Sequence, residues 1–142
     1  MVAPRSPFPV QPPDWPAPKG YSNAWQVPAG RDLLFLAGQI GWDEREQLVD
    51  GGFVPQFRKA LENVRTLVET AGGRPEDVVR MTIFVADREP YLADLPGVGA
   101  AYRDVFGRHF PCMSLVEVAA LLEPGALVEV EATAALDPNP ET

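Results

Sequence analysis

The chain has 142 residues and a mass of 15.5 kDa, the size of one domain with a buried core. Twelve Lys and Arg residues against 20 acidic residues give a net charge of −8, which argues against nucleic acid as a partner. The single cysteine, Cys112, excludes an internal disulfide and a cysteine-based metal site, and any histidine chemistry depends on His109 alone. No apolar run reaches the roughly 18 residues that span a bilayer, so we expect a cytoplasmic protein without membrane contact.

Prolines concentrate in residues 1–20, which hold seven of the 16 in the chain. Proline fixes φ and lacks an N–H donor, so this stretch is neither a helix nor a central strand. We expect a proline-rich arm, either a disordered or polyproline-like tail or an arm that packs on a neighbouring subunit through Phe8 and Trp15. The domain proper then covers residues 21–136, and residues 137–142 form a polar tail.

Two strands, residues 23–27 and 33–39, are predicted at the start of the domain. The segment between them, Pro28-Ala29-Gly30-Arg31-Asp32, has the composition of a turn. The two strands are therefore predicted to form a hairpin.

The clearest helix begins at Phe53 and ends before Gly72-Gly73, a pair that stops helices. Its apolar residues recur at spacings of three and four: Phe53, Phe57, Leu61, Val64, Leu67, Val68 and Ala71. The opposite face is charged, so this helix covers a sheet on one side only.

The second half of the domain reads as strand, helix, strand, strand. Residues 78–85 are apolar on both faces, which predicts a central strand, and residues 92–106 form a second, weaker helix. Residues 114–121 and 127–136 are the last two strands, separated by a turn at Pro124-Gly125.

The resulting order, β-β-α-β-α-β-β, predicts an α/β (α+β) domain whose mixed sheet carries both helices on one face. The opposite face presents residues such as Phe84, Leu115 and Val128 or their neighbours, and a monomer would aggregate through it. Three sheets closed around a barrel-like centre would bury that face and leave a cleft at each seam. A second domain or a foreign partner would serve the same physical need.

Short blocks of the sequence carry a resemblance to known proteins, and they follow one another between Tyr21 and Ala135. They are Tyr21-Ser22-Asn23-Ala24, Leu36-Ala37-Gly38-Gln39-Ile40, the run from Gln56 to Val64, Ala71-Gly72-Gly73, the run from Asp77 to Val85, Tyr102 with Phe106, Ser114-Leu115-Val116-Glu117-Val118 and the run from Leu127 to Ala132. In order and spacing they resemble the RidA/YjgF family, also called the reactive-intermediate deaminase or L-PSP family.

This resemblance implies a homotrimer of chorismate-mutase-like fold that binds a small molecule in clefts between its subunits. It also implies hydrolysis of enamines or imines, such as 2-aminoacrylate or 2-iminobutanoate, to a 2-keto acid and ammonia without a cofactor. In the family an arginine holds the substrate carboxylate and a glutamate positions water. Some members have been described as ribonucleases, an activity that the acidic composition and the single histidine disfavour.

Three positions match the family's site. Glu129 corresponds to the water-positioning glutamate and is the catalytic candidate, while Tyr21 offers a hydroxyl at the groove mouth. Gly38 allows a ligand to approach the backbone closely. Without the resemblance, Glu129 would be interpreted as a solvent-facing strand residue paired with a lysine or arginine.

The family arginine is absent. Its block reads Pro111-Cys112-Met113-Ser114 here, so Met113 stands where the arginine would be. Methionine has no charge, and a carboxylate would lose one or two charge-assisted hydrogen bonds worth roughly 1.5–3 kcal/mol each. Cys112 is expected either to be a small buried side chain beside the ligand or, with a base nearby, a nucleophile.

Two further departures point the same way. Ala37 replaces a serine before the Gly-Gln pair, and Gly99 replaces an asparagine in the second helix. All three changes remove polar groups, which predicts a more apolar pocket with Ala37 and Met113 among its substrate-binding residues. The alternative for Met113 is an ordinary packing residue. The sequence leaves open whether another arginine, such as Arg80 or Arg103, reaches the groove.

Three functions therefore compete. The first is an enamine or imine hydrolase whose substrate depends less on a small carboxylate. The second is a non-catalytic small-molecule binder that kept the trimer, and the third is a protein-interaction trimer that uses the proline-rich arm.

Overall fold

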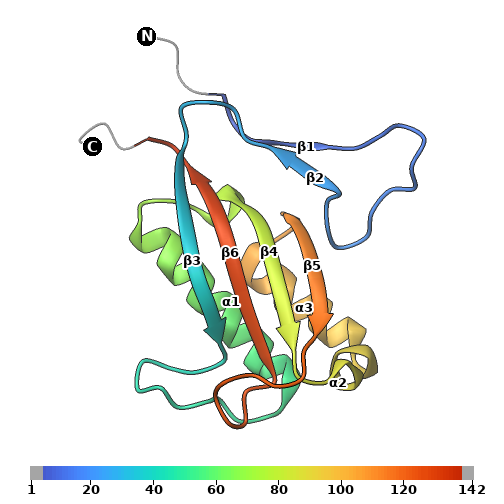
Figure 1. Cartoon of the computed structure of the whole chain (residues 1–142), viewed down its shortest axis with the longest axis vertical. Helices are drawn as coiled ribbons and strands as arrows, with labels where there is room; N and C mark the ends of the chain where they lie inside the picture. The colour runs from blue at the N-terminus through green and yellow to red at the C-terminus, as the bar shows by residue number, and fades with distance from the viewer. Residues whose placement is uncertain (1–4, 139–142) are drawn as a thin grey trace.

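The computed structural model describes residues 5–138, which form two sheets with helices on one side (Figure 1). The described elements, in chain order, are β1 (Phe8–Val10), β2 (Ala24–Gln26), β3 (Asp32–Ile40), α1 (Phe53–Thr70), a 3-10 turn (Pro75–Asp77), β4 (Val78–Val85), α2 (Arg88–Ala93), α3 (Leu95–Phe106), β5 (Cys112–Glu117) and β6 (Val128–Leu136).

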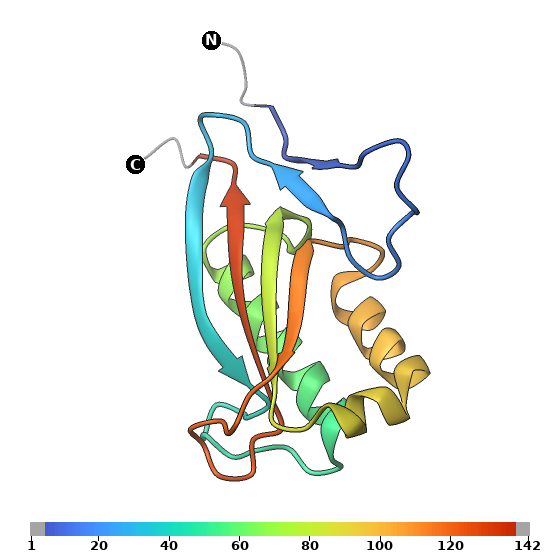
Figure 2. The same cartoon turned by 45° about the vertical axis from the view of Figure 1, so that its right-hand side comes forward.

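The main sheet has four strands in the order β3-β6-β4-β5 (Figure 2). β6 is antiparallel to both β3 and β4, whereas β4 and β5 are parallel. Parallel neighbours need a crossover connection, and α2 and α3 supply it. The predicted mixed sheet is confirmed.

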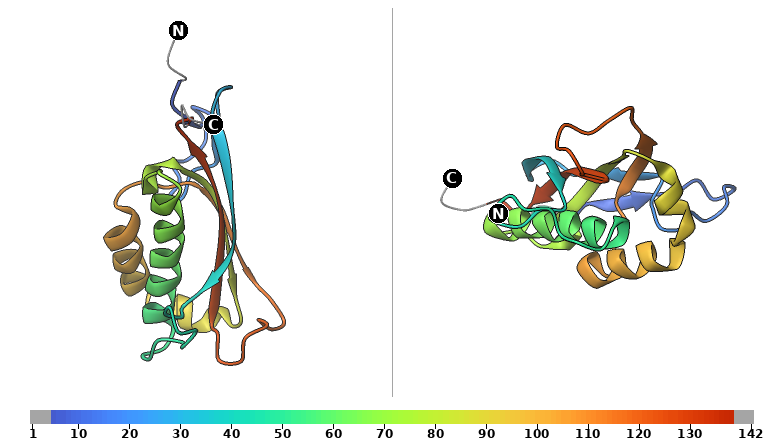
Figure 3. Two further views of the ribbon diagram at one scale, coloured as in Figure 1. Left: turned by 90° about the vertical axis from the view of Figure 1, so that its left-hand side faces the viewer. Right: turned by 90° about the horizontal axis from the view of Figure 1, so that it is seen from below.

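Both long helices, α1 and α3, pack on the same face of this sheet (Figure 3, left). The core lies between them and the sheet, where Leu61 and Val64 of α1 and Val85, Val128 and Val130 of the strands are buried. The helix expected from Phe53 and the strand expected over residues 78–85 are confirmed in type and position.

The opposite face of the sheet is uncovered in the single chain. It exposes Leu33, Phe35 and Val116, whose fractional exposures are 55%, 74% and 41%. Of the residues expected on this face, Phe84 borders a pocket there, but Val128 is fully buried and Leu115 packs toward the helices. Val116, the neighbour of Leu115, and Glu129, the neighbour of Val128, lie on the open face instead.

The predicted hairpin of residues 23–27 and 33–39 is wrong. β2 pairs with β1 in a separate two-stranded sheet, and β3 pairs with β6 instead. The side chains explain the divergence, because the Ser22 hydroxyl and the Trp25 indole N–H both donate to the Phe110 carbonyl, at 2.6 and 3.0 Å. These bonds hold the segment near the start of β5 and away from β3.

The arm is partly ordered as a strand. Residues 8–10 form β1, an exposed edge strand, where a disordered or polyproline-like tail was expected. Pro9 fits there because an edge strand tolerates a missing donor. Residues 1–4 of the arm and 139–142 of the polar tail lie outside the described residues.

Two boundaries differ from the predicted ones. The single helix expected at 92–106 is two helices, because the Asp94 carboxylate accepts the Gly97 N–H at 2.9 Å and caps α3. The strand expected at 114–121 is β5, which begins at Cys112 and ends at Glu117. In the described part of the chain no helix combines the length and apolar character that crossing a bilayer requires.

Candidate functional site

Three of the predicted site residues meet at the edge strand β5. A Ser22–Cys112 bridge lays the segment after Gly20 along the start of β5, and the Ser22 N–H donates to the Pro111 carbonyl at 3.1 Å. Tyr21, Cys112 and Met113 consequently line one shallow pocket of about 190 Å³.

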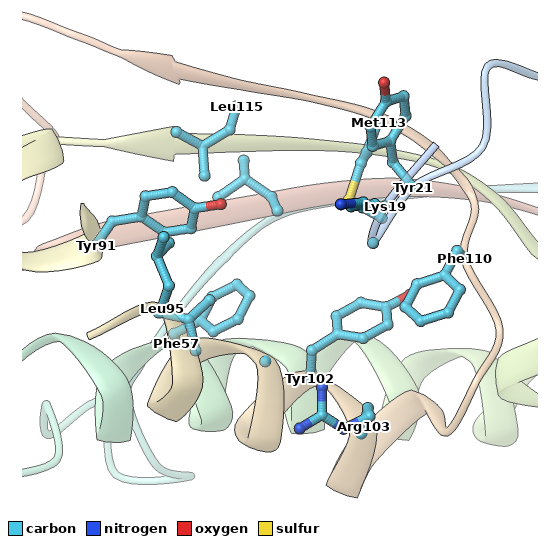
Figure 4. Close-up of a pocket in the computed structure, with 14 residues that line it drawn as sticks. Lys19, Tyr21, Phe57, Tyr91, Leu95, Tyr102, Arg103, Phe110, Met113 and Leu115 are labelled. Atoms are coloured by element: carbon cyan, nitrogen blue, oxygen red, sulfur yellow. The ribbon is translucent and has the colours of Figure 1, made fainter. Parts of the chain in front are cut away.

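A larger cavity of about 410 Å³ opens between the β5 side of the sheet and helices α2 and α3 (Figure 4). We call it the main cavity because it is more enclosed than a groove of about 470 Å³ beside β2. Tyr21 and Met113 line it as well, so the two pockets adjoin. The remaining lining residues are Lys19, Gly20, Phe57, Ile83, Tyr91, Leu95, Val98, Gly99, Tyr102, Arg103, Phe110 and Leu115. No carboxylate is among them, and most of the wall is apolar.

Met113 lies in the wall of this main cavity. It is half-buried, packs against the hydrophobic core and carries its thioether toward the helices (Figure 4). Where the family has a cation, this chain presents an uncharged and polarisable surface. An apolar or aromatic group fits such a wall better than a carboxylate does.

Tyr102 and His109 support the floor of the cavity. The Tyr102 hydroxyl donates to the His109 carbonyl at 2.5 Å, and burial raises the pKa of this phenol. A nitrogen of the His109 ring lies 2.6 Å from the Val78 carbonyl, and the ring meets Trp25 edge-on at 5.1 Å. Both residues thus help to hold the end of α3 against β4 and β2.

The Cys112 thiol also has a structural partner. Its sulfur donates to the Val79 carbonyl at 3.1 Å, across the β4–β5 pair. Within residues 5–138 no basic side chain contacts it in a hydrogen bond or ion pair, so a base that would activate the thiol is missing from the described part. The placement favours the small packed side chain over the nucleophile.

Glu129 and Gly38 meet on the open face of the sheet. A bulge between Leu36 and Gln39 shifts the register of β3 and brings Gly38 beside Glu129 of β6. A Cβ at position 38 would lie only 2.7 Å from Cδ of Glu129, so the carboxylate occupies the space that glycine leaves. Both residues border a depression of about 320 Å³, which is also lined by apolar side chains such as Phe84 and by a second carboxylate, Glu131.

Ala37 is exposed, and its carbonyl accepts a hydrogen bond from the Gln39 amide at 3.0 Å. It belongs to neither of the cavities described above, although it neighbours Gly38 in the bulged strand. Its placement beside the depression is consistent with a rim position.

The candidate residues therefore form two groups within one chain. Tyr21, Cys112 and Met113 lie at the β5 edge, whereas Gly38 and Glu129 lie on the open face. Met113 faces the helices and Glu129 faces away from them, because Val128 and Val130 on either side of Glu129 are buried in the core. A single chain does not bring the two groups together.

Comparisons with known proteins agree with this arrangement of the fold. The family described as Endoribonuclease L-PSP matches residues 14–136. The chain belongs to the RidA/YjgF family. A RutC family protein of Pyrococcus horikoshii is 36% identical over 84% of this chain and 90% of its own length. The 2-iminobutanoate/2-iminopropanoate deaminase of Salmonella typhimurium is 38% identical over 72% of this chain and 78% of its own.

Solved structures of RidA/YjgF proteins superpose on the same architecture. The Rid protein YyfB of Yersinia pestis gives a TM-score of 0.81 at 30% identity and covers 93% of this chain and all of its own. The YjgF protein of E. coli gives 0.63 at 34% identity, over 81% of this chain and 87% of its own. The fold class predicted from the sequence is thereby confirmed.

The main cavity of this RidA/YjgF member contains charged and polar side chains that were not predicted as site residues from the sequence. Lys19 and Tyr91 line it, and no pattern around either residue predicted this. Arg103, one of the two arginines left open, lines the main cavity, while Arg80 lines the shallow pocket beside Cys112. Across residues 5–138 no three His, Cys, Asp or Glu side chains cluster as metal ligands would.

Proposed function

We propose that this RidA/YjgF member is a cofactor-independent enamine or imine hydrolase that acts in clefts between the copies of a homotrimer. The family includes proteins named 2-iminobutanoate/2-iminopropanoate deaminase, so imine chemistry is represented among its relatives. The observation that carries the proposal is Glu129, a half-buried carboxylate that borders the depression on the open face beside Gly38.

Glu129 is positioned to act on water in this proposal. The carboxylate accepts a proton as the water oxygen attacks the imine carbon, and it returns this proton to the nitrogen, which gives a tetrahedral adduct with one hydroxyl and one amino group. The carboxylate then takes the hydroxyl proton and passes it to the nitrogen as the C–N bond breaks, so that ammonia leaves and the carbonyl product forms. No redox step or external electron carrier is needed.

The separation of the two residue groups supports a site between copies. Tyr21 and Met113 of one copy supply the wall that contacts the substrate, and Gly38 and Glu129 of a second copy supply the carboxylate. The exposed apolar side chains of the open face, Leu33 and Phe35 among them, give such an assembly a surface to bury.

The substrate proposed for this site depends less on a carboxylate next to the reacting carbon. Met113 lies where the family arginine would hold that group, and its thioether cannot replace two directed N–H donors. Small imino acids are therefore expected to be poor substrates, and imines with apolar substituents better ones.

The decisive experiment follows hydrolysis of 2-aminoacrylate and 2-iminobutanoate generated in situ. We expect wild type to be slow, Met113→Arg to accelerate hydrolysis by about 10-fold to 100-fold, and Glu129→Gln to abolish the gain in the double variant. Met113→Leu and Glu131→Gln are the matched controls, since Glu131 is an exposed carboxylate in the same depression.

Wild-type activity well above buffer would show that another residue holds the carboxylate. Activity in the Glu129→Gln variant would show that Glu129 is not the base.

A non-catalytic small-molecule binder is the second candidate, because the main cavity of the single chain contains no carboxylate that could act on water. Ligand binding that survives in both wild type and Glu129→Gln, with no turnover of any imine in either, would favour it.

A further inference from the structure

The charge of the main cavity is opposite to that of the whole chain. The protein carries a net charge of −8, yet the cavity is lined by Lys19 and Arg103 and by no acidic side chain. A cleft of one sign with low-dielectric walls raises the local concentration of ligands of the opposite sign. The two cations therefore favour an anionic ligand over a cationic one.

Neither cation is engaged by the protein. The ion pairs formed within residues 5–138 join Arg31 to Asp137, Arg58 to Asp104 and Arg65 to Glu69. The Lys19 and Arg103 side chains have no hydrogen bond or ion pair in this part of the chain. Their charges remain available for a ligand.

The Arg103 guanidinium has a defined place along α3. Its Nη1 lies 3.0 Å from the point that a Cβ at Gly99 would occupy, one turn earlier in the helix. A larger side chain at position 99 would therefore displace the guanidinium. Glycine leaves the space in which Arg103 lies at the cavity edge.

Tyr91 adds a polar group inside the apolar wall. Its ring rests against Phe53 at 6.2 Å, and its hydroxyl is directed toward the middle of the cavity (Figure 4). Unlike the Tyr102 hydroxyl, it makes no hydrogen bond with any described residue. It can donate to or accept from a ligand.

We propose that the main cavity binds an amphipathic carboxylate, with an apolar or aromatic body between Phe57, Leu95 and Met113. Its acidic group is attracted by the charges of Lys19, which lies beside Met113, and of Arg103 on α3 (Figure 4). The volume of about 410 Å³ lies within the range of roughly 300–1,000 Å³ typical of small-molecule pockets and leaves room for an aromatic ring with a side chain. This proposal rests on the proposed function and specifies it. The carboxylate lies away from the reacting imine, which is why Met113 is compatible with an acidic substrate.

The test uses binding alone, with three probes titrated by calorimetry: 3-phenylpropanoate, its neutral amide and propanoate. The full-length wild type should bind 3-phenylpropanoate more tightly than the amide by about 10-fold, because two exposed ion pairs each contribute up to about 1 kcal/mol. Propanoate, which lacks the ring, should bind more weakly than either. Arg103→Gln and Lys19→Gln should each reduce the preference for the acid by about threefold, and the double variant should lose it.

Arg108→Gln is the matched control. Arg108 is equally exposed, follows α3 directly and does not line the cavity, so the variant changes the net charge by the same amount. It should keep the full preference for the acid. Raising the salt concentration should weaken binding of the acid but not of the amide.

Equal binding of acid and amide by wild type, an absence of binding by either, or a preference that survives in the double variant would overturn the proposal. A failure of the hydrolase proposal would appear only in turnover, and a failure of the anion proposal only in these titrations.

Discussion

Replacing Gly38 tests most directly whether the position of the Glu129 carboxylate matters. Alanine at this position would place a methyl group 2.7 Å from Cδ of Glu129, closer than real side-chain contacts allow, so the carboxylate must move. We expect Gly38→Ala to lower the free energy of unfolding by at most about 1 kcal/mol, because the flexible carboxylate can swing away, and to abolish turnover, because the carboxylate is then displaced. Urea denaturation and an imine hydrolysis assay measure the two effects.

The cause can be isolated with a double-mutant cycle. If the carboxylate is what the methyl group meets, Gly38→Ala should cost much less in a Glu129→Ala background. Additive effects would mean that the backbone bulge, and not the carboxylate, requires the glycine.

At the residue scale, sequence reasoning proposed Tyr21, Gly38, Met113 and Glu129 as site residues, but it did not predict how they divide within the chain. Local sequence fixes which face of a strand a residue occupies, and this was sufficient for Glu129. It does not fix which cavity a side chain enters, because the cavity at Met113 depends on where α2 ends and α3 begins. Tyr91 lines the cavity because it lies on the short helix α2, and no spacing in the sequence predicted that α2 and α3 are separate helices.

Among the elements, α1 and the loop before β6 are joined by one buried side chain. Gln56 is 5% exposed, donates from Nε2 to the Gly125 carbonyl at 3.1 Å and accepts the Leu127 N–H at Oε1 at 2.8 Å. Gln56→Leu would leave both backbone groups unpaired and cost about 2–4 kcal/mol of stability. Gln47→Leu, at an exposed position, should cost under about 0.5 kcal/mol in the same denaturation experiment. Similar costs for the two variants would show that the bonds of Gln56 are replaceable.

The elements that sequence reasoning predicted well are those set by local periodicity, namely α1 and β4. Strand pairing was predicted less well, because it is decided by contacts far away in the sequence. Trp25 and Ser22 donate hydrogen bonds to the Phe110 carbonyl, 85 and 88 residues later in the chain. A local turn pattern carries no information about such distant partners. The pattern at residues 28–32 was a real turn, but it connects two different sheets.

The open face of the sheet carries exposed apolar side chains, Phe35 among them, beside polar ones such as Glu131, and the proposed trimer buries this face. Phe35→Glu would place a charge at a 74% exposed position of that face, and burying an unpaired charge opposes association. We expect light scattering to give three times the 15.5 kDa chain mass for wild type and one chain mass for the variant. Leu67→Glu, on the outer side of α1, should leave the mass unchanged. A wild type that is monomeric at every concentration tested would refute the trimer.

The division of Met113 and Glu129 between opposite sides of the sheet has a consequence for how activity scales. In the proposed arrangement a complete site exists only where two chains meet, so its abundance follows the law of mass action. Specific activity would then fall as the protein is diluted below the dissociation constant of the assembly. The proposed activity per cell would then rise more steeply than in proportion to the expression level, without any effector or covalent modification.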